Sequence, residues 1–223
     1  MKIVLNLLVF ALISTTNIYA QKEIKPKLNK IESLYKKGEL IEAKEISDVS
    51  ISYEKTMNNP KTWYLRGLVY MALDTSASMV GVTSDALQTS ISSFNKSDAL
   101  SEGEDEDPFI TDDMGNQTTK TQQIESYWGF YYNKAATAFG EKDFVEAITS
   151  FNNAALIKPN DTNSVINAGY AAVQAKMYDQ AKNSFYKAIE LGSTGKDLRL
   201  ILIYVVSTGQ NLLEESLDII RDA

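Results

Sequence analysis

The chain has 223 residues, with 22 basic and 29 acidic side chains, a net charge of −7, and neither histidine nor cysteine. An acidic chain without a basic stripe is a poor partner for nucleic acid or an anionic membrane surface. Without cysteine it forms no disulfide and carries no lipid on a thiol. The commonest general base, the commonest zinc ligands and the thiol nucleophile are missing too, so we expect no catalysis, cofactor or metal.

Residues 1–20 have the layout of a secretory signal peptide. Lys2 supplies a positive start, residues 3–13 are mostly apolar with Asn6 as the one strongly polar member, and the segment ends on the small residue Ala20. The apolar run is too short for a membrane span, which needs about 20 residues. We predict cleavage after Ala20 and a mature protein without a membrane span, in the bacterial periplasm or associated with the cell envelope.

Residues 21–100 predict two helical hairpins of degenerate sequence. The first begins with a helix at 28–37, and the second begins with a helix at 60–73. The partner of that second helix is displaced by residues 74–84, which are rich in serine, threonine and glycine and therefore predict a loop insertion. Doubling the length of a loop costs only about 0.6 kcal/mol, so the insertion is compatible with a packed hairpin.

Residues 101–123 have no helical period. They contain seven carboxylates, Glu102, Glu104, Asp105, Glu106, Asp107, Asp112 and Asp113. The spacing differs from that of a helix–loop–helix calcium site, and charge blocks of this kind are usually solvated. We therefore predict an acidic flexible insertion, and calcium binding remains the alternative.

Residues 124–223 contain two successive segments of 34 residues, 128–161 and 162–195, that agree at small and aromatic positions. The first segment carries Ala135, Phe144, Ala147, Phe151, Ala154 and Pro159. The second carries Gly169, Tyr178, Ala181, Phe185 and Ala188 at the same offsets. Each segment reads as two helices, at 128–140 and 144–157 in the first, and residues 196–223 form a partial third copy. A fixed short period predicts stacked units instead of one globular centre.

These positions resemble the tetratricopeptide repeat (TPR) family. The first segment matches its pattern at Tyr131, Ala135, Ala138, Ala147, Phe151, Ala154 and Pro159, and the second at Val165, Gly169, Ala172, Ala181, Phe185 and Ala188, with Ser193 where the family has proline. The resemblance implies an all-α fold, a right-handed superhelical solenoid of about four to five TPR-type helical hairpins with an acidic loop insertion.

In this family, ligands lie along the inner face formed by the first helix of each hairpin. Carried over position by position, the resemblance implies partner-binding residues at Tyr64, Met71, Tyr132, Asn133, Phe139, Asn167, Tyr170, Gln174 and Tyr204. This face is aromatic and amide-bearing, with almost no charge. Tyr132 and Ala136 stand where a carboxylate-clamping subtype has lysine and asparagine, so we expect no such clamp.

The aromatic residues also allow a purely structural interpretation, because every hairpin must bury a face against its neighbour. We expect Phe151, Phe185, Trp63 and Tyr131 in the core, and at least one exposed ring in the cluster at 127–131. For Tyr132 and Tyr170, core packing and groove lining are equally compatible with the sequence.

The leading functional hypothesis is a non-catalytic scaffold that binds a peptide or partner protein of an envelope complex on the concave inner face. The alternative is a carbohydrate-binding helical-repeat protein of an outer-membrane uptake system, because aromatic rings also stack on sugars. The apolar last pair leaves three alternatives open: it contacts a partner, it contacts another copy of the chain (self-association), or the protein continues beyond residue 223. Solenoids normally end on a polar helix, whereas the last pair, at 196–223, begins with a very apolar helix.

Overall fold

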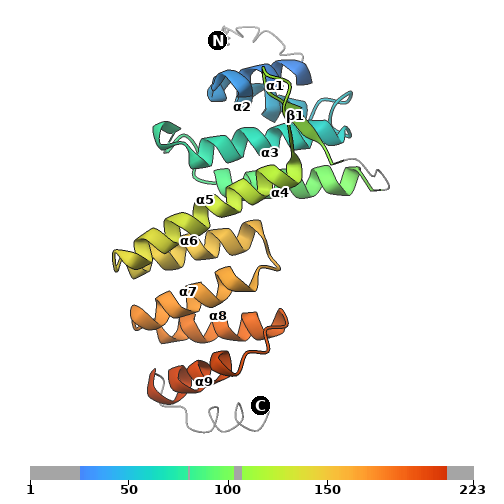
Figure 1. The fold of residues 1–223 in the computed structure, drawn as a ribbon. Helices are drawn as coiled ribbons and strands as arrows, with labels where there is room; N and C mark the ends of the chain where they lie inside the picture. The colour runs from blue at the N-terminus through green and yellow to red at the C-terminus, as the bar shows by residue number, and fades with distance from the viewer. Residues whose placement is uncertain (1–25, 80, 103–106, 210–223) are drawn as a thin grey trace, which may run out of the picture.

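The computed structural model describes residues 26–79, 81–102 and 107–209, and within them the helices form hairpins that stack in chain order (Figure 1). Helices α1 (Leu28–Lys37) and α2 (Leu40–Ser50) form the first hairpin, followed by α3 (Pro60–Thr75) with α4 (Ala86–Leu100), α5 (Lys120–Gly140) with α6 (Phe144–Ile157), and α7 (Thr162–Gln174) with α8 (Tyr178–Glu190). Helix α9 (Lys196–Tyr204) follows α8. The predicted solenoid of helical hairpins is confirmed, while the predicted signal peptide and the predicted end of the last pair lie outside the described residues.

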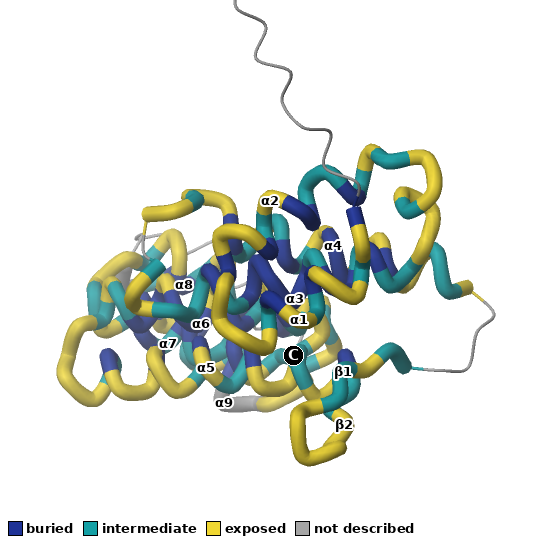
Figure 2. The backbone as a smooth tube through the Cα atoms, turned by 90° about the horizontal axis from the view of Figure 1, so that it is seen from above, coloured by how far each residue is buried: buried dark blue, intermediate teal, exposed yellow. Residues whose placement is uncertain are grey.

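The two helices of each hairpin contribute to opposite sides of the stack. Viewed from above, α5, α7 and α9 lie along one side, and α2, α4, α6 and α8 lie toward the other (Figure 2). We call the surface formed by α5, α7 and α9 the A-helix face. Among the described residues, no helix is long and apolar enough to cross a membrane.

Glycine on the first helix of a hairpin lets an aromatic ring of the second helix approach closely. A Cβ atom added to Gly67 would lie 2.5 Å from the Phe94 ring, and one added to Gly169 would lie 2.5 Å from the Phe185 ring. Ala135, which is fully buried, holds the corresponding position in the hairpin between them. The repeated small residue therefore sets the distance between paired helices.

Three of the four predicted core aromatics are buried, since Tyr131, Phe151 and Phe185 expose 7%, 4% and 0% of their surface. Trp63 is the exception. It is only half-buried, and its indole N–H donates to the Met57 carbonyl at 2.7 Å. The turn after α2 supplies an acceptor for the indole outside the core, which the repeat pattern does not encode. The expected exposed ring in the cluster at 127–131 is Phe130, at 41%.

Helix α5 connects two separate hydrophobic clusters. Tyr127 and Tyr131 pack into the cluster formed mainly by α1 to α4, whereas Ala135 and Ala138 belong to the cluster formed with the later helices. Asp74, in the last turn of α3, accepts hydrogen bonds from the hydroxyls of Tyr127 and Tyr131, each at 2.6 Å. One carboxylate thus joins the first half of the stack to the second.

The described part of the acidic segment contains a β-hairpin that the sequence did not predict. Strand β1 (Phe109–Thr111) pairs antiparallel with β2 (Gln117–Thr119), so the described part of the chain is not purely α-helical. Asp112 closes the turn by accepting the backbone N–H groups of Met114 at 2.9 Å and Asn116 at 2.8 Å. Side-chain acceptors of this kind stabilise tight turns in place of backbone bonds.

Helix α5 also begins at Lys120, eight residues before the predicted start at Trp128. Thr119 accepts the backbone N–H of Gln122, and the Gln122 side chain accepts the backbone N–H of Thr119. This capping box satisfies two backbone donors that a helix start otherwise leaves unpaired. It fixes the helix start directly after the hairpin.

Two other segments differ locally from the prediction. Between α3 and α4 the chain makes a short 3-10 turn, Ala77–Met79, inside the predicted loop insertion. At the end of the described residues, α9 continues into a π-helical turn, Val205–Gly209, where a regular helix was expected.

Candidate binding face

Seven of the nine predicted binding residues lie together on the A-helix face. Helix α5 contributes Tyr132, Asn133 and Phe139, α7 contributes Asn167, Tyr170 and Gln174, and α9 contributes Tyr204. The two amides Asn133 and Gln174 are exposed, and so is Tyr204 at 49%. The other four side chains are half-buried.

The other two predicted residues, Tyr64 and Met71, are not accessible. Both lie on α3, where they expose 0% and 8% of their surface and belong to the first hydrophobic cluster. Ile110 of β1 packs against the same cluster. The repeat pattern treats α3 as one more open helix, whereas the packing of the first hydrophobic cluster covers Tyr64 and Met71 and removes them from the A-helix face.

Tyr132 and Tyr170 combine the two interpretations that the sequence left open. The Tyr132 ring packs edge-on against Phe151, with ring centroids 5.4 Å apart, and the Tyr170 ring does the same against Phe185 at 5.6 Å. The Tyr132 hydroxyl also accepts a hydrogen bond from the Asn167 side chain at 2.8 Å. Core contacts thus fix the rings while both residues remain partly exposed at the surface.

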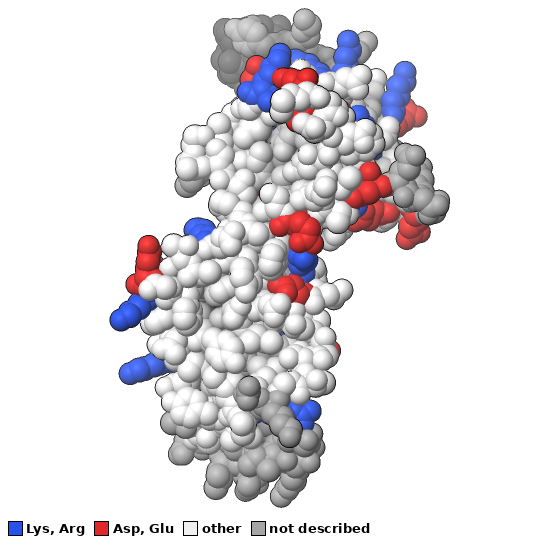
Figure 3. All heavy atoms as spheres, viewed as in Figure 1, with Lys and Arg blue, Asp and Glu red and all other residues white. Residues whose placement is uncertain are grey.

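The A-helix face carries little charge. In the space-filling view, which looks at this side of the molecule, the surface over α5 and α7 is mostly uncharged (Figure 3). At its border, Lys158 pairs with Glu125 at 2.8 Å and lies 4.7 Å from the centre of the Trp128 ring. A ligand on this face therefore meets rings and amides, with ion pairs only at the edge.

Asp161 fixes the border of the face at the start of α7. It accepts the indole N–H of Trp128 at 2.9 Å and the backbone N–H groups of Asn163 and Ser164. Burial acts to raise the pKa of this carboxyl, but the hydrogen bonds from Ser164 and Trp128 outweigh burial and hold the pKa below 3.8. Asp161 therefore stays ionised at neutral pH.

Sequence reasoning did not assign Trp128 and Asp161 to the site. The signal was present, because they are the first and last residues of one 34-residue unit. Asp161 also precedes Ser164 with the spacing of a helix N-cap. The spacing could not predict the hydrogen bond between Trp128 and Asp161, because this bond depends on how successive hairpins stack.

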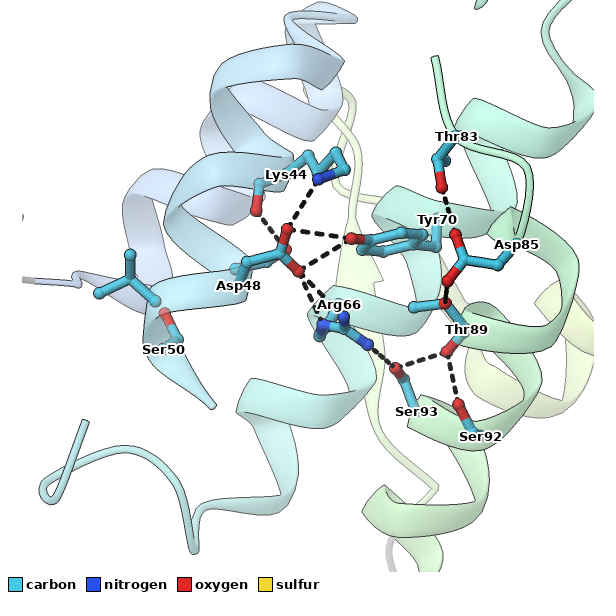
Figure 4. A network of polar contacts seen from close by, with 12 residues as sticks. Lys44, Asp48, Ser50, Arg66, Tyr70, Thr83, Asp85, Thr89, Ser92 and Ser93 are labelled. Atoms are coloured by element: carbon cyan, nitrogen blue, oxygen red, sulfur yellow. Dashed lines mark hydrogen bonds and ion pairs between the residues drawn. The ribbon is translucent and has the colours of Figure 1, made fainter. Parts of the chain in front are cut away.

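A cluster of charged and polar side chains connects α2, α3 and α4 through hydrogen bonds (Figure 4). Asp48 accepts hydrogen bonds from Arg66, Tyr70 and Lys44, and Arg66 also donates to Ser93. Burial, followed by the bond to Asp48, raises the pKa of the Tyr70 phenol, so this hydroxyl stays protonated and donates. The groups hold three helices together, and none has the free partner that acid–base chemistry needs.

The described residues contain no group of histidine, cysteine, aspartate or glutamate side chains that could hold a metal ion. Glu104, Asp105 and Glu106 lie outside those residues, so the calcium alternative stays untested.

The protein is therefore a solenoid of helical hairpins, in which α5, α7 and α9 form a largely uncharged face with aromatic side chains. Residues 163–191, which span α7 and α8, match the tetratricopeptide repeat family. The hairpin of α7 and α8 is therefore a tetratricopeptide repeat, and it corresponds to the second of the two predicted copies.

Solved structures with similar architecture include MamA AMB-1, at 14% identity, covering 87% of this chain and 93% of that chain with a TM-score of 0.39. MamA from Desulfovibrio magneticus RS-1 is 15% identical, with coverage of 87% and 93% and a TM-score of 0.34. YrrB, described as a TPR protein with an unusual peptide-binding site, is 15% identical, with coverage of 86% and 80% and a TM-score of 0.38. Likeness at this level transfers neither ligand nor activity. No curated protein matches the sequence.

Proposed function

We propose that the protein is a non-catalytic scaffold of the bacterial periplasm or cell envelope that binds a peptide or partner protein on the A-helix face. The observation that carries this proposal is the set of seven aromatic and amide side chains that α5, α7 and α9 bring to one largely uncharged surface.

The chemistry of the face favours an uncharged peptide segment. Tyrosine rings offer large, rigid contact areas with a polar end, and such residues dominate binding energy at protein interfaces. The exposed amides of Asn133 and Gln174 can pair with the N–H and C=O groups of a peptide backbone. Because few charges take part, binding should change little with salt concentration.

Site-specific photo-crosslinking in cells tests this assignment. A photoreactive residue at Asn133 or Gln174 is expected to give a discrete crosslinked species. Thr149 on α6 and Asn183 on α8, which are also exposed and belong to the opposite side, provide the matched controls. Equal crosslinking from both sides, or none from the A-helix face, would contradict the proposal. Saturable binding of an oligosaccharide in calorimetry would instead indicate that the ligand is a glycan and not a peptide.

Export is inferred from residues 1–20. Expression of the full chain in a Gram-negative host should give a periplasmic product whose N-terminal residue is Gln21. Cell fractionation measures the location of the product, and N-terminal sequencing identifies its first residue. A cytoplasmic product that keeps Met1 would contradict the proposed location without affecting the proposed binding face.

A further inference from the structure

The β-hairpin of residues 107–119 lies over α1 and α3 (Figures 1 and 2), and two cavities lie beside it. Ile110 packs against the cluster to which these helices contribute. On one side, Asp107, Pro108 and Phe109 line a cavity of about 710 Å³ together with the start of α3. On the other side, Asp113 and residues of α1 line a cavity of about 450 Å³. We call the surface beneath the hairpin and these two cavities the hairpin groove.

The charges of the groove complement those of the hairpin. Lys36 and Lys37 line the cavity on the α1 side, and Lys55 and Lys61 line the cavity at the start of α3. Glu32 pairs with Lys36 and with Lys61, each at 2.9 Å. Within the described ranges, Lys37 and Lys55 make no ion pair. The groove is therefore basic, while the hairpin presents Asp107 and Asp113 to it.

The hairpin fills this groove incompletely. Tyr64 lines the larger cavity and is fully buried, yet its hydroxyl has no hydrogen-bond partner. Across the part of the chain that the structure describes, no hydrogen bond joins residues 109–119 to α1 or α3. Each strand has only three residues, and a two-stranded hairpin of this size is marginally stable by itself. Segments with so few anchoring contacts open at low free energy while the rest of a protein stays folded.

We propose that the hairpin groove is a second binding site, which takes an extended acidic peptide segment with an aliphatic side chain, and that the chain's own hairpin occupies it in cis. Ile110 indicates the apolar anchor, and the lysines on α1 and before α3 indicate the acidic flanks. This site is separate from the A-helix face on α5, α7 and α9, and it does not depend on the function proposed for that face.

A trans-complementation experiment tests the proposal. In one variant, residues 108–119 are replaced by a glycine–serine linker of equal length, and the probe is a fluorescent synthetic peptide with the sequence of residues 107–120. Saturable binding to the folded variant is expected. Binding to the wild type should be at least about tenfold weaker, because the tethered hairpin competes at high effective concentration.

Substitutions identify the contacts. A probe with Ile110→Ser should bind about tenfold more weakly, since it loses the partly buried aliphatic side chain that packs against the cluster. Lys37→Gln with Lys55→Gln in the linker variant should weaken binding and reduce its dependence on salt. Lys187→Gln, an exposed lysine on α8, is the matched control and should change neither. The proposal is overturned if the folded variant does not bind the probe, or if the Ile110→Ser probe binds equally well.

Hydrogen exchange on the wild type keeps the proposal testable if the linker variant does not fold. Amides of residues 109–119 are expected to exchange faster than those of α1 and α3, through an opening that exposes little surface. Exchange of the hairpin only together with α3, by global unfolding, would overturn the proposal.

Discussion

Gly169 determines how closely α7 and α8 approach, because the Phe185 ring occupies the place of its missing side chain. Gly169→Ala should lower the free energy of unfolding by about 1 kcal/mol or more. The overpacking penalty of about 1–3 kcal/mol exceeds the gain in helix propensity, which is at most about 1 kcal/mol. Gly129→Ala on α5 is the control, because nothing lies within 4 Å of its added Cβ, and it should stabilise. Urea denaturation measures both, and equal shifts would contradict the packing argument.

Two tyrosines of the first hydrophobic cluster differ in whether their hydroxyl has a hydrogen-bond partner. The Tyr64 hydroxyl is buried without a partner, whereas the Tyr131 hydroxyl donates to Asp74. Tyr64→Phe should therefore leave stability unchanged or raise it by about 1 kcal/mol, and Tyr131→Phe should lower it by about 1 kcal/mol. Thermal unfolding distinguishes the two, and a loss of stability in Tyr64→Phe would indicate a partner for that hydroxyl.

At the scale of the element, Asp161 stabilises the start of α7 and connects it to Trp128. Asp161→Ala should cost about 1–2 kcal/mol, the usual range for removing a helix N-cap. Asp143, which caps α6 by accepting the backbone N–H of Glu146, offers a comparable cap without a link to the previous hairpin. A larger loss for Asp161→Ala than for Asp143→Ala, measured by denaturation, is expected from the additional Trp128 bond.

The contribution of Asp161 should depend on pH in a defined direction. Its pKa in the folded protein lies below the ordinary value of 3.8, so its stabilising effect is fully present above that value. As pH falls below 3.8 and through the lower folded pKa, the carboxylate is protonated and the effect is lost. The stability difference between wild type and Asp161→Asn should therefore be constant from pH 7 to about 5 and shrink toward pH 3. A difference that grows on acidification would contradict this assignment.

At the scale of the whole molecule, the two hydrophobic clusters are coupled through Asp74. Burial, followed by the bond to Asp74, raises the pKa of both the Tyr127 and Tyr131 phenols, so both remain hydrogen-bond donors across the physiological range. Asp74→Ala leaves two buried hydroxyls without their acceptor and should cost about 2–4 kcal/mol. It should also separate the unfolding of the two halves, giving non-coincident transitions when fluorescence and circular dichroism are compared. Asp98→Ala, which removes the ion pair to Lys120 at the start of α5, is the control and should leave a single transition.

Capping residues and helix-ending residues explain why the bounds of some helices could be predicted to the residue. Helix α6 matches its predicted bounds because Asp143 caps its start and Pro159 follows its end. The 34-residue period likewise predicted the two hairpins from α5 to α8, since each unit repeats the same small and bulky positions. Helix α5 started earlier than predicted because the capping box at Thr119 and Gln122 lies outside the repeated unit.

The sequence by itself determined the stacking of helical hairpins, because the stacking follows from periodicity within one unit. The seven side chains assigned to the A-helix face came from the resemblance to the tetratricopeptide repeat family, and their role in binding stays a prediction. Tertiary structure alone decided that Tyr64 and Met71 are buried, that Asp74 joins α3 to α5, and that residues 107–119 form a hairpin over α1 and α3. These features arise from contacts between segments far apart in the chain. A repeat pattern specifies which face of a helix is apolar, but it does not specify which distant segment covers that face.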